Sequence, residues 1–380
     1  MNQETTTQGT GPLQIAVVTD TYYPDINGVA FSLARLCGGL RARGHRVEII
    51  RSGQAHGEDE ITVWSWSLPG YREVKVGAPW PGCFRRRWEK NRPDVVYVAI
   101  ETPLGFSATS AALQLGIPVV GGYHTNFSDY LRKYGAHWIG KQVWRYQKWF
   151  HSRLDRTLVP SPDAREKLVA AGFSKVGVLG RGVDTTLFSP ARRSDALRQE
   201  LGVTGDTPIA LVVSRVSSEK NIGLAIRAFI RMRKSCPDMV CIVVGDGPAR
   251  PKLMRAHPEV KFPGYLTGCA LADCYASSDI LLFPSETETF GNVLIEGMAS
   301  GLAIQSYDYA AAAWHGIDGV NLLKVKKGDE AAFLDAADRL LDPSIRATLS
   351  AGALQTAASL GWAGIVAEME MILREVIATK

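Results

Sequence analysis

The sequence predicts an α/β protein made of two doubly wound parallel-sheet domains of the Rossmann-like kind, facing a central cleft. Its 380 residues are enough for two domains of ordinary size. Short β-branched runs alternate with helical patterns over almost the whole length, which is typical of a parallel sheet covered by helices. A polar stretch at residues 186–206 interrupts this alternation, and the same pattern then starts again.

The first domain is expected at residues 12–185. Its expected strands are residues 13–19, 47–50, 95–98 and 118–120, and its expected helices are residues 29–43 and 103–115. Gly44 ends the first of these helices, as a glycine commonly does. Residues 1–11 are polar and contain no apolar stretch, so we expect a disordered tail there and no signal peptide.

The second domain is expected at residues 207–361, after a linker at residues 186–206. Its expected strands are residues 209–214, 240–244, 279–283 and 303–306, and its expected helices are residues 222–233 and 293–299. A further amphipathic helix is expected within residues 362–380. In each domain, ligands should lie beyond the carboxyl ends of the strands.

The composition supports a globular protein with a full core, since 46% of the residues are hydrophobic and 9% are aromatic. The formal net charge of +5 does not imply a nucleic-acid partner, and none is expected. The six cysteines show no Cys-x-x-Cys spacing, which favours a reduced, intracellular protein and argues against a structural zinc site. No run approaches 18 apolar residues, so no membrane span is expected.

Two glutamates, Glu288 and Glu296, flank the point where a buried strand gives way to a helix. Between them, the backbone N–H groups of Phe290, Gly291 and Asn292 lie at the helix N-terminus, where anionic ligands are held readily. Carboxylates also accept hydrogen bonds from sugar hydroxyls. Together these groups suit a nucleotide sugar, whereas the alternative interpretation makes both glutamates solvated surface charges.

Other candidate residues follow strands at their carboxyl ends. Arg215 and Lys220 lie five residues apart on one loop, so both can turn toward a diphosphate, unless they are simply exposed loop charges. Gly28 opens a helix and lets a phosphate approach the backbone, or else serves a plain turn. His124 follows the strand at residues 118–120, where a lone histidine is commonly structural.

The segment from Glu288 to Gly301 resembles the donor-site signature of retaining GT-B glycosyltransferases, the large family that includes sucrose synthase and many mannosyltransferases. The resemblance implies that Glu288 and Glu296 hold the donor and that Arg215 and Lys220 hold its diphosphate. Neither a metal nor another cofactor is then required, in keeping with a sequence that has no Asp-x-Asp motif. Cationic side chains would stabilise the departing phosphate instead.

The same resemblance implies roles for the first domain. Gly28 matches a glycine that approaches the donor phosphate and the acceptor, although Asn27 replaces the second glycine often found there. His124 is placed near the anomeric centre and the C6 position of the donor sugar. Such enzymes lack an obvious nucleophile, so a front-face reaction is expected in which the phosphate receives the acceptor proton. In this fold, the closing helix crosses back to the first domain.

Residues 72–92 and 132–156 are each basic and aromatic. Such segments can lie in an anionic membrane interface, or they can be solvated faces over an aromatic core. The stretch from His124 to Tyr134, with Leu179–Asp184, is similar to bacterial mannosyltransferases and to glycolipid synthases related to sulfoquinovosyl-diacylglycerol synthase. The expected acceptor is therefore a membrane lipid such as diacylglycerol, with the protein on the cytoplasmic face of the inner membrane.

The leading prediction is a retaining, metal-independent hexosyltransferase that uses a UDP- or GDP-linked sugar and a lipid hydroxyl. A GDP-mannose-dependent α-mannosyltransferase with a non-lipid or polysaccharide acceptor is one alternative, and a sugar-nucleotide epimerase on the same fold is another. A protein that only binds nucleotide sugars or scaffolds a membrane is the non-enzymatic alternative. These motifs do not fix the base, the sugar or the oligomeric state.

Overall fold

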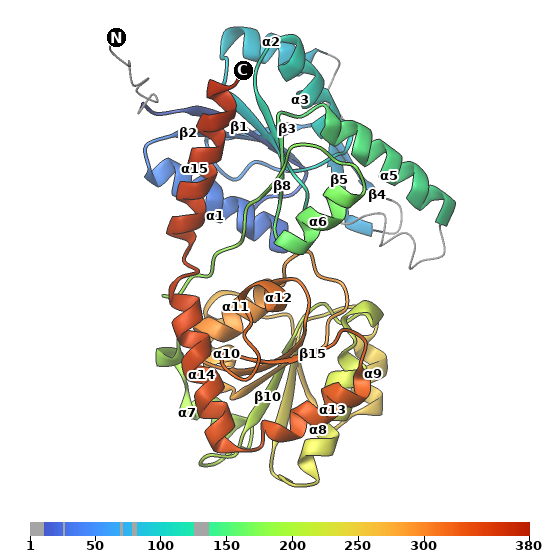
Figure 1. Ribbon diagram of the computed structural model, residues 1–380, viewed down its shortest axis with the longest axis vertical. Coiled ribbons are helices and arrows are strands. Elements are labelled where there is room, and N and C mark those ends of the chain that lie inside the picture. Colours follow the sequence, from blue (N-terminus) through green and yellow to red (C-terminus); the bar gives the residue numbers. More distant parts are fainter. Residues whose placement is uncertain (1–10, 26, 69–70, 78–81, 125–136) are drawn as a thin grey trace. The chain divides into compact units, whose positions relative to one another are not determined.

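The computed structural model of the protein describes residues 11–25, 27–68, 71–77, 82–124 and 137–380. The chain divides into two compact units (Figure 1). The first unit runs to Arg181 and resumes at Trp362–Lys380, and the second unit is Gly182–Gly361. Each unit has its own parallel sheet with helices on both faces, which confirms the predicted fold class. The predicted disordered tail lies outside the described residues, except for Gly11.

The first unit is built on a seven-stranded sheet in the order β3-β2-β1-β6-β7-β8-β9. All its strand pairs are parallel, and a short antiparallel pair, β4 and β5, accompanies it. The strands are β1 Gln14–Thr19, β2 Arg46–Ser52, β3 Glu60–Val63, β4 Ser65–Leu68, β5 Tyr71–Gly77, β6 Val95–Val98, β7 Val119–Gly122, β8 Arg156–Val159 and β9 Val176–Val178. The helices are α1 Gly28–Ala42, α2 Cys83–Lys90, α3 Pro103–Gln114, α5 His137–Ser152, α6 Pro162–Ala170 and α15 Trp362–Ala378.

The two faces of this sheet are covered by different helices, because successive side chains of a strand point to opposite sides. Ile15 and Val17 of β1 pack in a cluster with residues of α1 and α15, whereas the intervening residues of β1 pack with α2 and α3. Helix α15 follows the second unit in the sequence yet packs beside α1 (Figure 1). Gly39 of α1 permits this approach, since a Cβ there would lie 2.4 Å from a methyl carbon of Val366.

The second unit is built on a six-stranded parallel sheet in the order β12-β11-β10-β13-β14-β15. The strands are β10 Ile209–Val213, β11 Val240–Val244, β12 Lys261–Gly264, β13 Ile280–Phe283, β14 Ala303–Tyr307 and β15 Leu323–Val325. The helices are α7 Asp195–Glu200, α8 Ile222–Arg233, α9 Arg250–Ala256, α10 Gly268–Ser277, α11 Asn292–Ala299, α12 Ala311–His315, α13 Glu330–Arg339 and α14 Pro343–Ala358, with 3₁₀ turns η1 Pro190–Arg192 and η2 Ser218–Lys220.

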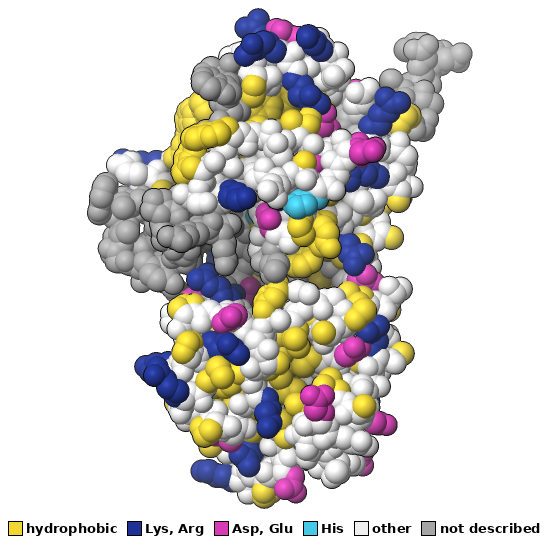
Figure 2. All heavy atoms as spheres, turned by 180° about the vertical axis from the view of Figure 1, so that it is seen from behind, with side chains coloured by type: hydrophobic (Ala, Val, Ile, Leu, Met, Phe, Trp, Pro, Cys, Tyr) yellow, Lys and Arg dark blue, Asp and Glu magenta, His cyan; other side chains and the backbone are white. Residues whose placement is uncertain are grey.

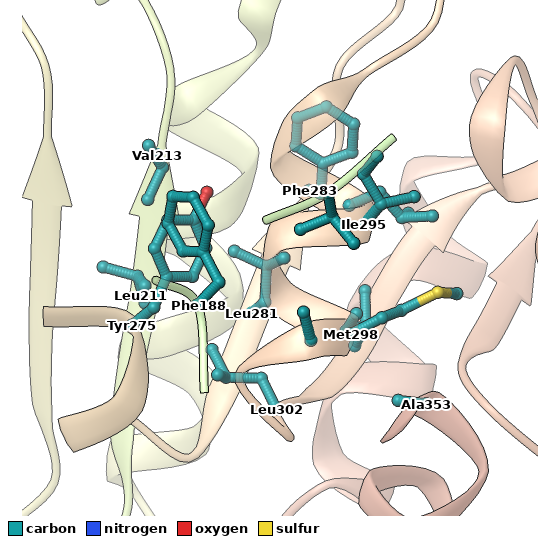
Figure 3. Close-up of a cluster of buried hydrophobic side chains, with 14 of the residues drawn as sticks. Phe188, Leu211, Val213, Tyr275, Leu281, Phe283, Ile295, Met298, Leu302 and Ala353 are labelled. Carbon is teal, nitrogen blue, oxygen red and sulfur yellow. The ribbon is translucent and has the colours of Figure 1, made fainter. Parts of the chain in front are cut away.

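The core of this unit also lies on both faces of its sheet. Leu211 and Val213 of β10 belong to the cluster drawn in Figure 3, together with Leu281 of β13 and Met298 of α11. The alternate residues of β10 belong to a second cluster, with α8 and α13. All five residues of β10 are therefore buried, which is why this strand appears in the sequence as a continuous apolar run.

The stretch expected to be a linker, residues 186–206, is part of the second unit and carries η1 and α7. Arg198 is only 4% exposed, and its guanidinium donates to Oδ2 of Asp279 at 2.9 Å and to the carbonyl oxygen of Thr207 at 2.7 Å. Arg193 also pairs with Asp279, at 3.0 Å. A polar sequence is compatible with this packed segment because the buried cation finds a carboxylate that lies far along the chain.

Candidate functional site

The carboxyl ends of β10 and β13 bring two of the predicted segments together in the second unit. These strands pair in parallel, so the loop after β10, which holds η2, meets the loop after β13. Nζ of Lys220 lies 2.5 Å from Oε1 of Glu288 and 3.0 Å from the carbonyl oxygen of Thr287. Both charged side chains are 16% exposed. A predicted cation and a predicted carboxylate therefore form one largely buried ion pair at the sheet edge.

Two further residues hold Glu288. The Ser285 hydroxyl donates to Oε1 of Glu288 at 2.7 Å, and the Tyr309 hydroxyl donates to its carbonyl oxygen at 2.8 Å. No described group donates to Oε2 of Glu288, which leaves that oxygen able to accept a hydrogen bond from a ligand. Sequence reasoning missed both partners. The spacing of Ser285, three residues before Glu288, is a usable signal, whereas Tyr309 comes from the loop after β14.

Glu296 lies in the second turn of α11. Its Oε2 accepts a hydrogen bond of 2.9 Å from the hydroxyl of Tyr275, a fully buried tyrosine of α10. Figure 3 shows Tyr275 in the core next to Phe188, and the two ring centroids lie 5.4 Å apart. Burial raises the pKa of Glu296 to about 7, although the hydrogen bond from Tyr275 opposes this effect. Near neutral pH, this carboxyl group is therefore divided between its acid form and its carboxylate form.

The N-terminus of α11 presents backbone donors between the two glutamates. Gly291 caps the helix with a φ of +97°, and it offers no side chain to accept from the first turn. In the part of the chain that the structure describes, nothing accepts from the N–H groups of Phe290, Gly291 and Asn292. The Phe290 ring is 3% exposed and packs in the core, so only the backbone of that residue is available. These three donors form a position suited to an anion.

Arg215 is exposed on the same loop as Lys220. The backbone beneath this loop comes from the Gly245-Asp-Gly247 turn, and the Val216 N–H donates to the carbonyl oxygen of Asp246 at 2.9 Å. A Cβ at Gly245 would lie 1.9 Å from the Ser214 carbonyl oxygen, and the φ of this glycine is +133°. Glycine is therefore needed here so that the turn can support the loop of Arg215.

His124 lies in the first unit, directly after β7, and is 8% exposed. Its Nδ1 is 2.7 Å from Nη2 of Arg181, and its Nε2 is 3.0 Å from the hydroxyl oxygen of Tyr97. Burial, the charge of Arg181 and the nearby His151 hold the pKa of His124 well below its usual value. Sequence reasoning missed Tyr97 and Arg181 because they reach His124 from β6 and from the segment after β9.

Gly28 begins α1 and is exposed. The preceding residue, Asn27, caps the helix, and its Oδ1 accepts from the Ala30 N–H at 2.9 Å. This cap uses one of the first-turn donors that an anion would need. Asn27 therefore has a structural role as a helix cap, which its place at the position of the family's second glycine does not predict. Buried Arg51 holds the same loop through Oδ2 of Asp25, at 3.0 Å.

The first basic and aromatic segment, residues 72–92, differs from its prediction. Phe84 and Trp88 are 2% and 1% exposed, and their rings pack 5.0 Å apart in the core of the first unit. The expectation that these aromatic side chains meet a membrane is therefore wrong, and a solvated basic face over an aromatic core describes α2 instead. Trp80 lies outside the described residues.

The second segment, residues 132–156, is described from residue 137 and forms α5. It exposes Tyr146 at 36% and Trp149 at 46%. Trp149 stacks on Phe106 of α3 at 5.9 Å between centroids, and the Arg153 guanidinium lies 4.9 Å from the ring of Trp149. On the face shown in Figure 2, hydrophobic and basic side chains are interspersed over the first unit. Helices long and apolar enough to cross a membrane are absent from the described ranges.

Known proteins resemble this chain along most of its length. Residues 26–187 match the model of Glycosyltransferase Family 4, and residues 207–343 match that of Glycosyl transferases group 1. The chain is 35% identical to a GDP-mannose-dependent alpha-mannosyltransferase of Mycolicibacterium smegmatis, over 78% of this chain and 80% of that protein. It is 30% identical to a sulfoquinovosyl transferase of Arabidopsis thaliana, over 70% of this chain and 53% of the relative. An alpha-monoglucosyldiacylglycerol synthase of Acholeplasma laidlawii is 26% identical, with 77% and 79% covered.

Solved structures with the same architecture are more distant in sequence. A sucrose-phosphate synthase from Thermosynechococcus elongatus superposes with a TM-score of 0.77 at 19% identity, over 97% of this chain and 100% of that one. Anabaena HepE in complex with UDP gives a TM-score of 0.77 at 19% identity, over 96% and 100%. At this identity the likeness concerns the fold alone, and it agrees with the arrangement of two parallel-sheet units.

Proposed function

Since the chain belongs to the glycosyltransferases that the family 4 and group 1 models describe, we propose that it transfers a hexose, with retention of configuration, from a nucleoside diphosphate sugar to a hydroxyl group. The protein is a glycosyltransferase with the GT-B fold. The observation that carries the finer proposal is the Lys220–Glu288 ion pair, which lies at the sheet edge near the N-terminus of α11, where the first N–H groups have no acceptor among the described residues.

We assign the donor diphosphate to Arg215, Lys220 and the N-terminus of α11. An arginine fork and a lysine ammonium suit two neighbouring phosphates, and the N–H groups at the N-terminus of α11 add directed donors. We assign the hydroxyl groups of the donor to Glu288 and Glu296, because Oε2 of Glu288 is available and the Glu296 carboxyl is held in place by Tyr275.

In the proposed reaction, the bond between the anomeric carbon and the phosphate oxygen breaks, and a bond to the acceptor oxygen forms on the same face of the sugar. The acceptor proton passes to the departing phosphate, so the products are a glycoside and a nucleoside diphosphate. The developing negative charge is stabilised by Arg215 and Lys220, together with the N–H groups of α11. We therefore propose that the transfer requires no metal ion or other cofactor.

We propose a membrane lipid such as diacylglycerol as the acceptor and assign acceptor binding to the first unit. Relatives named for sulfoquinovosyl transfer and glucosyldiacylglycerol synthesis support a lipid. The exposed Trp149 and Tyr146 support contact with a membrane surface, and the exposed Lys141, Arg145 and Lys148 on the same helix add attraction to anionic headgroups. The protein would then act as a peripheral protein on the cytoplasmic face of the inner membrane.

The test is a transfer assay on the full chain with UDP-glucose, UDP-galactose, UDP-glucuronate and GDP-mannose, each with diacylglycerol in phosphatidylglycerol vesicles. We expect one donor to yield a glycolipid whose anomeric configuration, measured by NMR, matches that of the donor. The yield should survive an excess of EDTA. An inverted product contradicts retention, and complete loss in EDTA contradicts the metal-free mechanism.

A second candidate is a GDP-mannose-dependent α-mannosyltransferase whose acceptor is not a lipid. Its support is the relative of that name at 35% identity, which covers more of both chains than the sulfoquinovosyl transferase does. The same donor panel, run with mannose oligosaccharides in place of vesicles, separates the two candidates. Transfer from GDP-mannose to the oligosaccharide, with none to diacylglycerol, would favour this second function.

A further inference from the structure

The His124 ring is hydrogen-bonded at both of its nitrogens inside the first unit. Nδ1 faces Nη2 of Arg181 at 2.7 Å, and Nε2 faces the hydroxyl oxygen of Tyr97 at 3.0 Å. A guanidinium has donors and no acceptor, and it stays charged in proteins. Nδ1 must therefore offer its lone pair to Arg181. In a neutral imidazole the hydrogen is then on Nε2, and that N–H donates to the Tyr97 oxygen.

We propose that Arg181 and Tyr97 are positioning residues that hold His124 as the neutral imidazole with its hydrogen on Nε2, so that His124 neither gives nor takes a proton during the transfer. This inference rests on the proposed function for its mechanistic meaning. The acceptor proton must then leave by another route, which agrees with its transfer to the departing phosphate. His124 would act through its shape and position alone.

Burial and the charges of Arg181 and His151 all oppose the protonation of His124. Arg181 is 7% exposed, and no carboxylate of the described residues lies within ion-pair distance of its guanidinium. Among the described residues, His151 of α5 also lies near His124, and its own Nε2 pairs with Glu101 at 3.0 Å. Burial raises the pKa of the Tyr97 phenol to about 12, so this group keeps its hydrogen and remains a neutral partner.

The backbone also fits this arrangement. Tyr97 lies on β6 and His124 follows β7, and these neighbouring parallel strands bring the two rings to one sheet edge. Gly122 of β7 leaves the required room. A Cβ there would lie 2.3 Å from Nε2 of His124 and 2.3 Å from the Tyr97 oxygen. The contact between the two side chains therefore requires a glycine at position 122.

The direct test is ¹⁵N NMR of the full-length protein labelled at histidine, recorded without any donor between pH 5.5 and pH 8.5. Comparison with His124→Gln, or with Tyr97→Phe if that variant does not fold, assigns the resonance among the seven histidines. We expect His124 to stay neutral, with its hydrogen on Nε2, over the whole range. A hydrogen on Nδ1, or a titration midpoint between pH 6 and pH 7, overturns the inference.

A variant of Arg181 distinguishes a role in positioning His124 from a purely structural role. In Arg181→Met the opposing charge is gone, so we expect His124 to begin titrating within the measured range and kcat to acquire a new decline at low pH. Arg156→Met, which removes a half-exposed surface arginine of the same unit, should leave the pH profile unchanged. A uniform loss of kcat at every pH in Arg181→Met would indicate a structural role and contradict the proposal.

Failure of this inference is distinguishable from failure of the proposed function. A protein that shows no transfer with any donor contradicts the function, yet the NMR result for His124 stands by itself. An active transferase whose His124 takes up a proton near pH 6.5 contradicts only the inference.

Discussion

The hydroxyl of Tyr275 donates a hydrogen bond of 2.9 Å to Oε2 of Glu296, and the two side chains reach each other from neighbouring helices, α10 and α11. The tyrosine is fully buried, so this carboxyl group is fixed from the core side. Burial also disfavours the charged form of Glu296. The carboxylate that is useful for ligand binding therefore lowers the stability of the second unit.

Glu296→Gln should therefore stabilise the protein while it weakens donor binding. The pKa of Glu296 is about 7 in the folded protein and 4.5 in the unfolded chain, so the folded protein loses stability as pH rises from 4.5 to 7. Glutamine removes this penalty and keeps an acceptor for Tyr275. We expect a gain of roughly 1–2 kcal/mol in the free energy of unfolding at pH 8, after allowance for partial exposure, and none at pH 4.5.

Urea unfolding at both pH values measures this difference, and calorimetric titration of the donor measures the accompanying loss of affinity. Glu200→Gln, at an exposed position of the same unit, should change stability by less than about 0.5 kcal/mol. Equal stability of Glu296→Gln and the natural protein at pH 8 would show that burial of the Glu296 carboxylate does not destabilise the fold.

The Lys220–Glu288 ion pair should act as one unit in catalysis. Lys220→Met removes the ammonium of this 2.5 Å contact, and Glu288→Gln removes the carboxylate charge; we expect each to lower kcat/KM by at least about 100-fold, or roughly 2.7 kcal/mol. Because the two residues share one contact, the double variant should lose little more than either single variant. Lys234→Met, an exposed lysine at the end of α8, is the matched control.

Steady-state kinetics with the active donor complete this double-mutant cycle. Losses that add fully in the double variant would mean that Lys220 and Glu288 contact the substrate independently. Transfer at the natural rate in Glu288→Gln would remove Glu288 from the site altogether.

Much of the fold can be predicted from the sequence because the strands are buried on both faces. Strands 95–98 and 240–244 and the helix 222–233 have the bounds that the sequence predicts, since continuous β-branched runs and apolar periodicity report burial directly. The structure of residues 186–206 is harder to predict. This segment is held in place by the ion pair between Arg198 and Asp279, which are 81 residues apart. No local pattern predicts such a contact.

In the candidate site too, local sequence predicts some residues, whereas contacts between residues far apart in the chain cannot be predicted. Glu288 and Lys220 could be proposed from their places after two strands, and the structure brings them together because those strands are neighbours. The partners of His124 could not be proposed, since Tyr97 and Arg181 are 27 and 57 residues away. Trp88 and Trp149 lie in similarly basic and aromatic sequences, yet one is buried and the other is 46% exposed, and only the packing of α2 and α5 separates them.

The exposed aromatic side chains of α5 should contribute to membrane binding. Trp149→Ala combined with Phe106→Ala removes the stacked pair, and we expect partitioning into phosphatidylglycerol vesicles to fall about tenfold, or roughly 1.4 kcal/mol. Cosedimentation measures this change. Trp314→Ala, at a tryptophan of the second unit that is 39% exposed, should bind vesicles as the natural protein does. Unchanged partitioning in the double variant would show that the Trp149–Phe106 pair does not contribute to membrane binding.

Glu370 connects α15 to α1 through a cluster of basic side chains. Its Oε2 lies 2.6 Å from Nε of Arg43, and its Oε1 lies 2.9 Å from Nε of Arg374 and 3.3 Å from Nε2 of His45. Burial raises the pKa of Glu370, but the hydrogen bonds from Arg43 and Arg374, together with the nearby His45 ring, outweigh burial and lower the pKa to about 2. This value lies below the 4.5 of the unfolded chain, so the cluster stabilises the fold above pH 4.5 and loses its effect as pH falls toward 2.

Glu370→Gln should accordingly lower the free energy of unfolding at pH 7 by about 1–2 kcal/mol, a value reduced because Arg43 is 48% exposed and solvent screens its charge. By pH 3 the difference should fall to less than half. Glu375→Gln, which disturbs a pair between two exposed side chains on the same helix, should cost less than about 0.5 kcal/mol at either pH. Urea unfolding measures the free energy of unfolding at both pH values. A loss of stability in Glu370→Gln that is equal at pH 7 and pH 3 would arise from altered packing of α15 and not from the charge of Glu370.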